Sequence, residues 1–145
     1  MARAYRLGIA RRIGNRIIRT LLRIGWGPAR TYLLVTRGRT TGRLYRTPVT
    51  LVEQLPRRWL VAPYGEVGWV RNARAAGRVT LERGRRAETL RLAELGSRES
   101  APILRQYVRE VPITRPYFDA RPGSSLDDFA AEAPRHPVFE LIPGG

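Results

Sequence analysis

A turn rich in arginine and threonine is the part of this sequence whose residue types and spacing best suit chemistry. It lies between Gly38 and Gly42 and connects the apolar run at 32–35 to the alternating run at 47–55. Such a turn offers backbone N–H groups, hydroxyls and guanidinium groups at one point, which suits an anionic group such as a phosphate. A plain hairpin connection between two strands has the same pattern, so both interpretations stay open here.

The residues that enzymes use for nucleophilic or metal chemistry are nearly absent. There is no cysteine, so neither a disulfide framework nor a thiolate metal site can form. The single histidine, His136, has no partner histidine, so we expect no metal site and interpret it as a loop residue. A Ser-His-acid set would have to use that histidine, and no Gly-x-Ser-x-Gly motif accompanies it.

Positive charge is concentrated at the start of the chain. All 27 basic residues are arginine, and the net charge is +15. Twelve of the arginines precede the first acidic residue, Glu53, so residues 1–52 carry +12 and the remainder carries 15 minus 12, or +3. This asymmetry favours an anionic partner, which could be a ligand, a lipid surface or nucleic acid. We find no nucleic-acid recognition motif, so charge alone predicts no specific nucleic-acid partner.

Residues 4–24 are predicted to form a basic amphipathic helix. Its apolar side is formed by Ile9, Ile13, Ile17, Leu21 and Ile24, and the opposite side by Arg12, Arg16, Arg19 and Arg23. The arginines interrupt any signal-peptide core, and the segment is too polar to span a membrane. Its apolar face either docks on the protein's own barrel or lies on an anionic membrane surface.

After this helix the hydrophobic period changes from helical to alternating. We expect strands at 31–37, 47–53, 59–62, 78–82, 87–95 and 138–142, and helices at 69–76 and 99–111. Pro48 marks an edge or entry position because it has no N–H for a sheet ladder. This order predicts an α+β fold, a small antiparallel barrel with accessory helices.

The length fits one domain over 1–145, with the basic helix in 1–28 and the barrel over 30–145. Residues 112–137 are rich in proline and are predicted to be one long irregular segment with its tip at 121–125. Loops of that length are often lids that face a substrate.

Three segments resemble the deazaflavin-dependent nitroreductase family, one branch of the split β-barrel flavin and deazaflavin oxidoreductases. Residues 33–42 are similar to the family's strand followed by Thr-x-Gly-Arg-Lys-Ser-Gly. Residues 47–49, Thr-Pro-Val, are similar to its Thr/Asn-Pro-Leu/Val. Residues 68–79 are similar to its Pro-x-Trp-Tyr-x-Asn-Leu-x-Ala-x-Pro-x-Val, and this is the most specific match. The resemblance covers roughly residues 30–145.

The resemblance implies a groove for coenzyme F420. The first loop would take its phosphate and poly-γ-glutamate tail, and the residues around Trp69 would border the deazaflavin ring. The cofactor itself carries out the redox step, so the absence of a Ser-His-acid triad is expected. Relatives pass a hydride to nitroaromatics, quinones or other conjugated acceptors, and Tyr117 is the candidate proton donor. The implied cofactor contacts are Arg39, Thr40, Thr41, Gly42, Arg46, Thr47, Pro48, Ala62, Pro63, Tyr64, Gly65, Gly68, Trp69 and Asn72.

The chain departs from the family pattern at both usual phosphate cations. Thr40 stands where relatives have lysine, and Tyr45 stands where they have arginine, with Arg46 one place later. On a strand, that shift of one residue turns a side chain to the other face. Arg37, Arg39 or Arg43 could supply the missing charge through bidentate contacts. Thr114 stands where relatives place a tyrosine near the substrate.

Structural roles compete with these assignments. Trp69 could be a core aromatic, and Asn72 could bond its own helix backbone. Tyr64 and Tyr117 could be ordinary residues between surface and core.

Several functions therefore remain open. An F420-dependent oxidoreductase acting on a hydrophobic acceptor is the leading hypothesis. A barrel that binds FMN or a haem-type ligand is the second, and a membrane-surface protein that works through residues 4–24 is the third. We expect a cytoplasmic protein, peripheral at the inner face of the cell membrane if that helix contacts lipid, and a homodimer, since such barrels commonly dimerise.

Overall fold

The structure is a computed structural model that describes residues 29–144. Its elements are β1 (Thr31–Arg37), β2 (Leu44–Gln54), β3 (Arg57–Val61), α2 (Gly68–Ala76), β4 (Arg78–Arg83), β5 (Arg86–Glu94), α3 (Ser97–Glu110), the 3₁₀ helix η1 (Pro112–Tyr117), α4 (Leu126–Glu132), the 3₁₀ helix η2 (Ala133–Arg135) and β6 (Val138–Ile142). The helix predicted at 4–24 lies outside the described residues.

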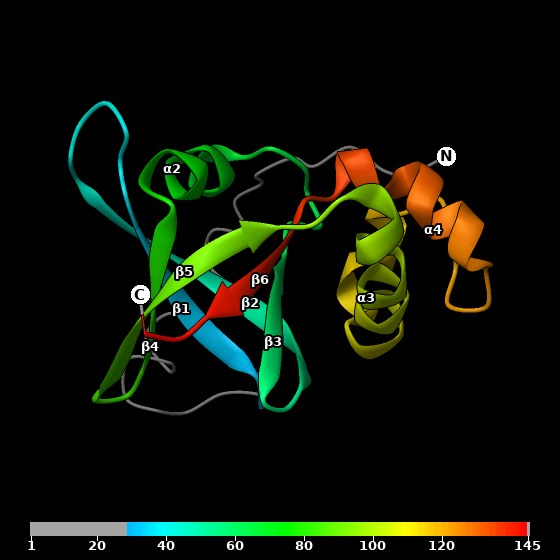
Figure 1. Cartoon of the computed structure of the whole chain (residues 1–145), viewed down its shortest axis with the longest axis horizontal. Coiled ribbons are helices and arrows are strands. Elements are labelled where there is room, and N and C mark those ends of the chain that lie inside the picture. The colour runs from blue at the N-terminus through cyan, green and yellow to red at the C-terminus, as the bar shows by residue number, and fades with distance from the viewer. Residues whose placement is uncertain (1–28, 145) are drawn as a thin grey trace.

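The six strands form a closed antiparallel barrel in the order β1-β2-β3-β6-β5-β4. This confirms the predicted fold class and all six strands. Helix α2 lies over one mouth of the barrel, and α3 and α4 pack together beside it (Figure 1). Gly77 ends α2 with a left-handed backbone conformation at φ 73°, a conformation that glycine adopts without steric cost. The short chain that follows leads directly into β4.

Alternation along β2 divides the core in two. Val49 and Leu51 point into the barrel, where they meet Trp69, Val70 and Ala73 of α2. Val52 points outward and joins a second cluster with Trp59, Leu104, Tyr107 and Phe129, which holds α3 and α4 against the barrel. The pattern that the sequence predicts for this strand is therefore the observed one.

Pro48 lies where β2 has a partner on one side only. Residues 44–50 pair with β1, and residues 51–54 pair with β3. The Leu51 N–H donates to the Arg30 carbonyl on the β1 side at 2.8 Å, so by alternation the Pro48 nitrogen faces away from β1. The missing donor therefore costs the ladder no hydrogen bond, as an edge position requires.

The prediction of one irregular segment over 112–137 is wrong, because the chain there forms η1, α4 and η2. Ser125 caps α4 by accepting a hydrogen bond from the Asp128 N–H at 3.2 Å, and two aspartates occupy the first turn. Phe129 is fully buried in the second core cluster and fixes α4 against α3. The predicted tip at 121–125 is a turn that leads into this helix.

Candidate functional site

The loop between β1 and β2 is held closed by its own hydrogen bonds. Gly38 N–H donates to the Arg43 carbonyl at 2.7 Å, and Gly42 N–H donates to the Gly38 carbonyl at 2.9 Å. Thr41 Oγ1 accepts from the Arg43 N–H, and the Arg37 guanidinium donates to the Gly42 carbonyl. The glycine N–H groups are therefore used within the loop. No partner is found in residues 29–144 for the N–H groups of Thr40 and Thr41, which remain available to a ligand.

Substitution of Gly38 tests how tightly this loop is packed. A Cβ atom at Gly38 would lie 2.5 Å from Thr41 Oγ1 and 2.9 Å from a ring carbon of Tyr45, so these two side chains would have to move. We expect Gly38→Ala to lower the free energy of unfolding by about 1–3 kcal/mol, measured by urea denaturation. Gly68→Ala is the matched control, because nothing lies within 4 Å of the Cβ it would add. Equal stabilities of the two variants would contradict this packing.

Asn72 connects α2 to the loop. Its side chain is 6% exposed, and its Oδ1 accepts from the Arg39 backbone N–H at 3.1 Å and from Arg39 Nη1 at 2.8 Å. The alternative in which Asn72 bonds its own helix backbone is therefore not what the structure shows. Two residues that the motif places 33 positions apart lie in direct contact, and Asn72 fixes both the loop and the Arg39 guanidinium.

The loop is flanked by cations that lack acidic partners. Within residues 29–144, no carboxylate forms an ion pair with Arg37, Arg39 or Arg43, so their charge is available to an anion. Arg46 differs, because its Nε donates to Glu82 Oε1 at 3.0 Å. Arg46 is therefore already neutralised, while Thr47 and Pro48 beside it are partly exposed on β2.

Trp69 belongs mainly to the core. It is 9% exposed, packs inside the barrel and lies 6.4 Å from the Phe139 ring, centroid to centroid. The backbone around it is more accessible, because α2 begins at Gly68 with no side-chain cap and no acidic residue in its first turn. The first N–H groups of a helix lack partners within the helix and carry partial positive charge. This helix end can thus donate hydrogen bonds to an electron-rich group.

A second group of predicted residues gathers around Tyr117. The rings of Tyr64 and Tyr117 meet edge to face with centroids 4.7 Å apart. Ala62 and Pro63 are buried behind them, and Gly65 turns the chain with φ 86°. Tyr117 therefore lies against the loop at 62–65, although more than 50 residues separate them. Thr114, by contrast, is buried and donates to the Val111 carbonyl.

The sequence analysis missed a buried acid and base behind this loop. Glu132 and His136 are 3% and 4% exposed, and Glu132 Oε2 lies 2.8 Å from His136 Nε2. His136 Nδ1 lies 2.9 Å from the Pro63 carbonyl, and its ring stacks on Phe118. Burial lowers the pKa of His136, and the Glu132 carboxylate opposes that shift. His136 is in a loop, as predicted, but it positions the 62–65 segment.

The Glu132 carboxylate also accepts hydrogen bonds from the backbone. The N–H groups of Asp119 and Ala120 each donate to its carboxylate at 2.8 Å. Glu132 and His136 are four residues apart, a spacing at which an acid and a base can meet. Within residues 29–144, no group of acidic or histidine side chains could hold a metal ion.

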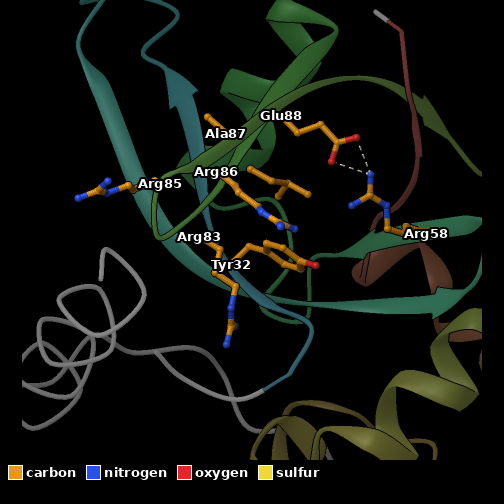
Figure 2. Close-up of a pocket in the computed structure, with 8 residues that line it drawn as sticks. Tyr32, Arg58, Arg83, Arg85, Arg86, Ala87 and Glu88 are labelled. Atoms are coloured by element: carbon orange, nitrogen blue, oxygen red, sulfur yellow. Dashed lines mark hydrogen bonds and ion pairs between the residues drawn. The ribbon is translucent and has the colours of Figure 1, made fainter. Parts of the chain in front are cut away.

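A cavity lies away from these residues. It has a volume of about 530 Å³ and is lined by residues of β1, β3 and the β4–β5 hairpin (Figure 2). Tyr32, at the start of β1, is on its wall, whereas the Gly38–Gly42 loop follows the end of the same strand. The cavity therefore opens at the barrel mouth opposite the predicted site.

Comparison with solved structures supports the fold. The chain is 19% identical to the protein Atu2129, of unknown function, from Agrobacterium tumefaciens str. C58, with a TM-score of 0.57; the match covers 90% of this chain and 53% of that one, so this chain spans about half its length. A structure described as a domain-swapped dimer is 20% identical over 91% of this chain and 96% of that one, with a TM-score of 0.56. An F420-H2 dependent reductase (FDR-A) is 22% identical over 78% and 94%, with a TM-score of 0.53.

Comparison with sequence families is more specific. A search of curated proteins finds no significant match. The model of the F420H(2)-dependent quinone reductase family matches residues 9–121, which is well over half of the chain and contains the loop, α2 and Tyr117. This chain therefore belongs to the F420H(2)-dependent quinone reductase family, and it is an oxidoreductase that uses coenzyme F420.

Proposed function

We propose that this protein reduces a hydrophobic conjugated acceptor, best represented by a quinone, with reduced coenzyme F420. The family description supports a quinone in particular. The observation that carries the proposal is the loop in which Asn72 holds Arg39 beside two further arginines, none of the three paired with a carboxylate within residues 29–144. An uncompensated cluster of this kind suits the anionic part of the coenzyme.

The residues present fit the coenzyme at two places. Arg39 and Arg43, with the N–H groups of Thr40 and Thr41, would bind its phosphate and carboxylates. The free N–H groups at the start of α2 would donate to polar atoms at the edge of the ring. When bound, the coenzyme supplies the hydride, and the protein supplies orientation and electrostatics. Arg46 is the weaker member of the predicted set, because Glu82 already neutralises it.

The 62–65 loop and Tyr117 would form the acceptor side. Ala62 and Pro63 are buried, so the partly exposed rings of Tyr64 and Tyr117 are the side chains that a hydrophobic acceptor would contact here. Reduction of a quinone to a hydroquinone takes one hydride and one proton, or the hydride alone if the product leaves as the hydroquinone anion. In this proposal the Tyr117 hydroxyl gives a proton to the acceptor oxygen, and solvent reprotonates it.

Removal of that hydroxyl tests this role. We expect Tyr117→Phe to lower kcat about 10²-fold while the KM for the quinone changes little, because the phenylalanine ring can keep the edge-to-face contact with Tyr64. Steady-state kinetics with reduced F420 and a soluble quinone would measure both constants. Tyr45→Phe, in an exposed position outside this group, should leave both constants unchanged. An unaltered kcat in Tyr117→Phe would remove Tyr117 as the donor.

Coenzyme binding is the direct test of the whole proposal. The purified protein should bind F420 at low salt, and the affinity should fall as salt rises, because an anionic tail on arginines is screened. Fluorescence titration of the deazaflavin would follow this, with FMN as the competing ligand. A protein that purifies yellow with a flavin spectrum, or that fails to bind F420 at low salt, would contradict the proposal.

The predicted membrane contact and homodimer stay proposals. Within residues 29–144, no helix is long and apolar enough to cross a bilayer. Residues 4–24 would contact an anionic membrane surface from one side, where a hydrophobic quinone could be reached. Homodimer formation is supported by the similar structure described as a domain-swapped dimer. Vesicle co-sedimentation before and after deletion of residues 1–25 tests the first, and light scattering tests the second.

A further inference from the structure

A second cluster of arginines lines the barrel mouth that lies opposite the F420 loop. The cavity of about 530 Å³ at this mouth is lined by Tyr32, Arg58, Leu81, Arg83, Arg85, Arg86, Ala87 and Glu88. Four arginines and one glutamate give this lining a net charge of 4 minus 1, or +3. The volume falls within the range that small-molecule sites occupy, about 300–1,000 Å³.

Strand alternation explains why charged side chains meet here. Leu34, Leu60, Leu81 and Leu90 all belong to the barrel interior. Tyr32, Arg58, Arg83 and Glu88 each lie two residues from one of these leucines, in the direction of this mouth. Because side chains alternate along a strand, these four face the same side as the leucines. Arg86 lies two residues beyond Glu88 in the same direction on β5. The barrel interior is thus apolar in the middle and becomes cationic at this end.

Two of the arginines are held in place by the protein. Arg58 Nη2 donates to both carboxylate oxygens of Glu88, at 3.0 and 2.9 Å, and the Arg58 side chain is only 15% exposed. Arg83 Nη1 donates to the Thr31 carbonyl at 2.7 Å, which ties the hairpin to β1. These contacts fix the wall of the cavity before any ligand enters.

Arg86 is the cation that is not engaged in this way. No hydrogen bond or ion pair is found for its side chain within residues 29–144. It extends toward Tyr32 and the Arg58–Glu88 pair, whereas Arg85 points away from them (Figure 2). Arg86 therefore offers an unpaired guanidinium next to an aromatic ring, a combination that suits an anion attached to an apolar body.

We propose that this mouth binds a small phosphorylated molecule with an apolar or aromatic body. Arg86 would contact the phosphate, since a guanidinium group can donate to two phosphate oxygens at once. Tyr32 and Leu81 would contact the body of the ligand. The Glu88 carboxylate repels the ligand's phosphate and also forms an ion pair with Arg58, so Glu88 limits the affinity of the site. This site is separate from the proposed F420 site and does not depend on it.

The test uses phenyl phosphate as the probe, with inorganic phosphate and phenol as comparisons, in isothermal titration calorimetry on the full chain at low salt. Phenyl phosphate should bind more tightly than inorganic phosphate, and phenol should not bind. Arg86→Gln should weaken phenyl phosphate at least 10-fold, the usual effect of one arginine–phosphate contact. Arg91→Gln is the matched control on the same strand, exposed and outside the cavity, and should change the affinity less than twofold.

Glu88→Gln separates a binding site from a merely solvated cluster. This variant removes the opposing charge and loosens Arg58, so phenyl phosphate should bind about 3–10-fold more tightly, a gain that a misfolded variant cannot produce. The double variant Arg39→Gln/Arg43→Gln removes the other proposed anion site, and the effects of Arg86→Gln and Glu88→Gln on the binding of phenyl phosphate should persist in it. Absence of phenyl phosphate binding in that double variant, equal effects of Arg86→Gln and Arg91→Gln, or no gain in Glu88→Gln would each overturn the proposal.

Discussion

Replacing Glu132 with alanine is expected to lower the free energy of unfolding by about 3–5 kcal/mol, the usual cost of breaking a buried charged network. The substitution would leave His136 Nε2 and the Ala120 N–H buried without an acceptor, and it would remove the acceptor of the partly buried Asp119 N–H. It would also release α4 from the segment that follows η1. Urea denaturation followed by tryptophan fluorescence would measure the change.

Two further variants separate the causes. Glu132→Gln keeps one acceptor oxygen and nearly the same volume, so it should recover a large part of the stability. Asp127→Ala removes an exposed carboxylate from the same helix and should cost less than about 1 kcal/mol. If Glu132→Ala were no less stable than Asp127→Ala, the buried network would not hold this part of the fold.

The largest effect on binding is expected from the double variant Arg39→Gln/Arg43→Gln. Each arginine contact to a phosphate or carboxylate contributes about 1.5–3 kcal/mol, so the loss of both should weaken F420 binding at least about 100-fold. The remaining affinity should depend less on salt, because fewer ionic contacts remain to be screened. Titration of F420 at two salt concentrations would measure both quantities.

Arg98→Gln is the matched control for this pair, since Arg98 is exposed at the start of α3 and far along the chain from the loop. It removes the same type of charge and should change the affinity less than twofold. Asn72→Asp adds a sharper comparison. The carboxylate can still accept both Arg39 hydrogen bonds but neutralises the guanidinium, so stability should persist while F420 affinity falls. Equal affinity in all three variants would exclude the loop as the anion site.

The strands could be predicted because each buries one face in the barrel. The alternation of Val49, Leu51 and Val52 has a direct meaning in a half-buried strand, and Gly77 marks the end of α2 by its own chemistry. The first residues of β2 escaped prediction because they bury little. Leu44 and Tyr45 are 50% and 44% exposed, and they belong to the strand only through backbone pairing with β1.

The region from η1 to η2 could not be read in the same way. Its prolines break the hydrophobic period, and α4 has seven residues, which is too short for a clear amphipathic repeat. The signal that was present is the serine cap with two aspartates after it. The contact between His136 and the Pro63 carbonyl joins positions 73 apart, and no local spacing encodes such a pair.

The residues that the family motif predicts for the candidate site have different roles in the folded protein. Asn72 and Arg39 meet, as do Tyr64 and Tyr117. Trp69 is mostly core, and Arg46 has an acidic partner. Which arginine is left unpaired depends on where acidic side chains end up in space. That is a property of the folded barrel and is invisible in the order of residues.

The position of β6 has a consequence for synthesis. This strand fits between β3 and β5 and is the last to be made. Between the completion of β5 at Glu94 and the appearance of Ile142, a ribosome adding about 5–20 residues per second needs roughly 2–10 s. Throughout that interval the edges of β3 and β5 that β6 will cover have no partner, and unpaired strand edges favour aggregation.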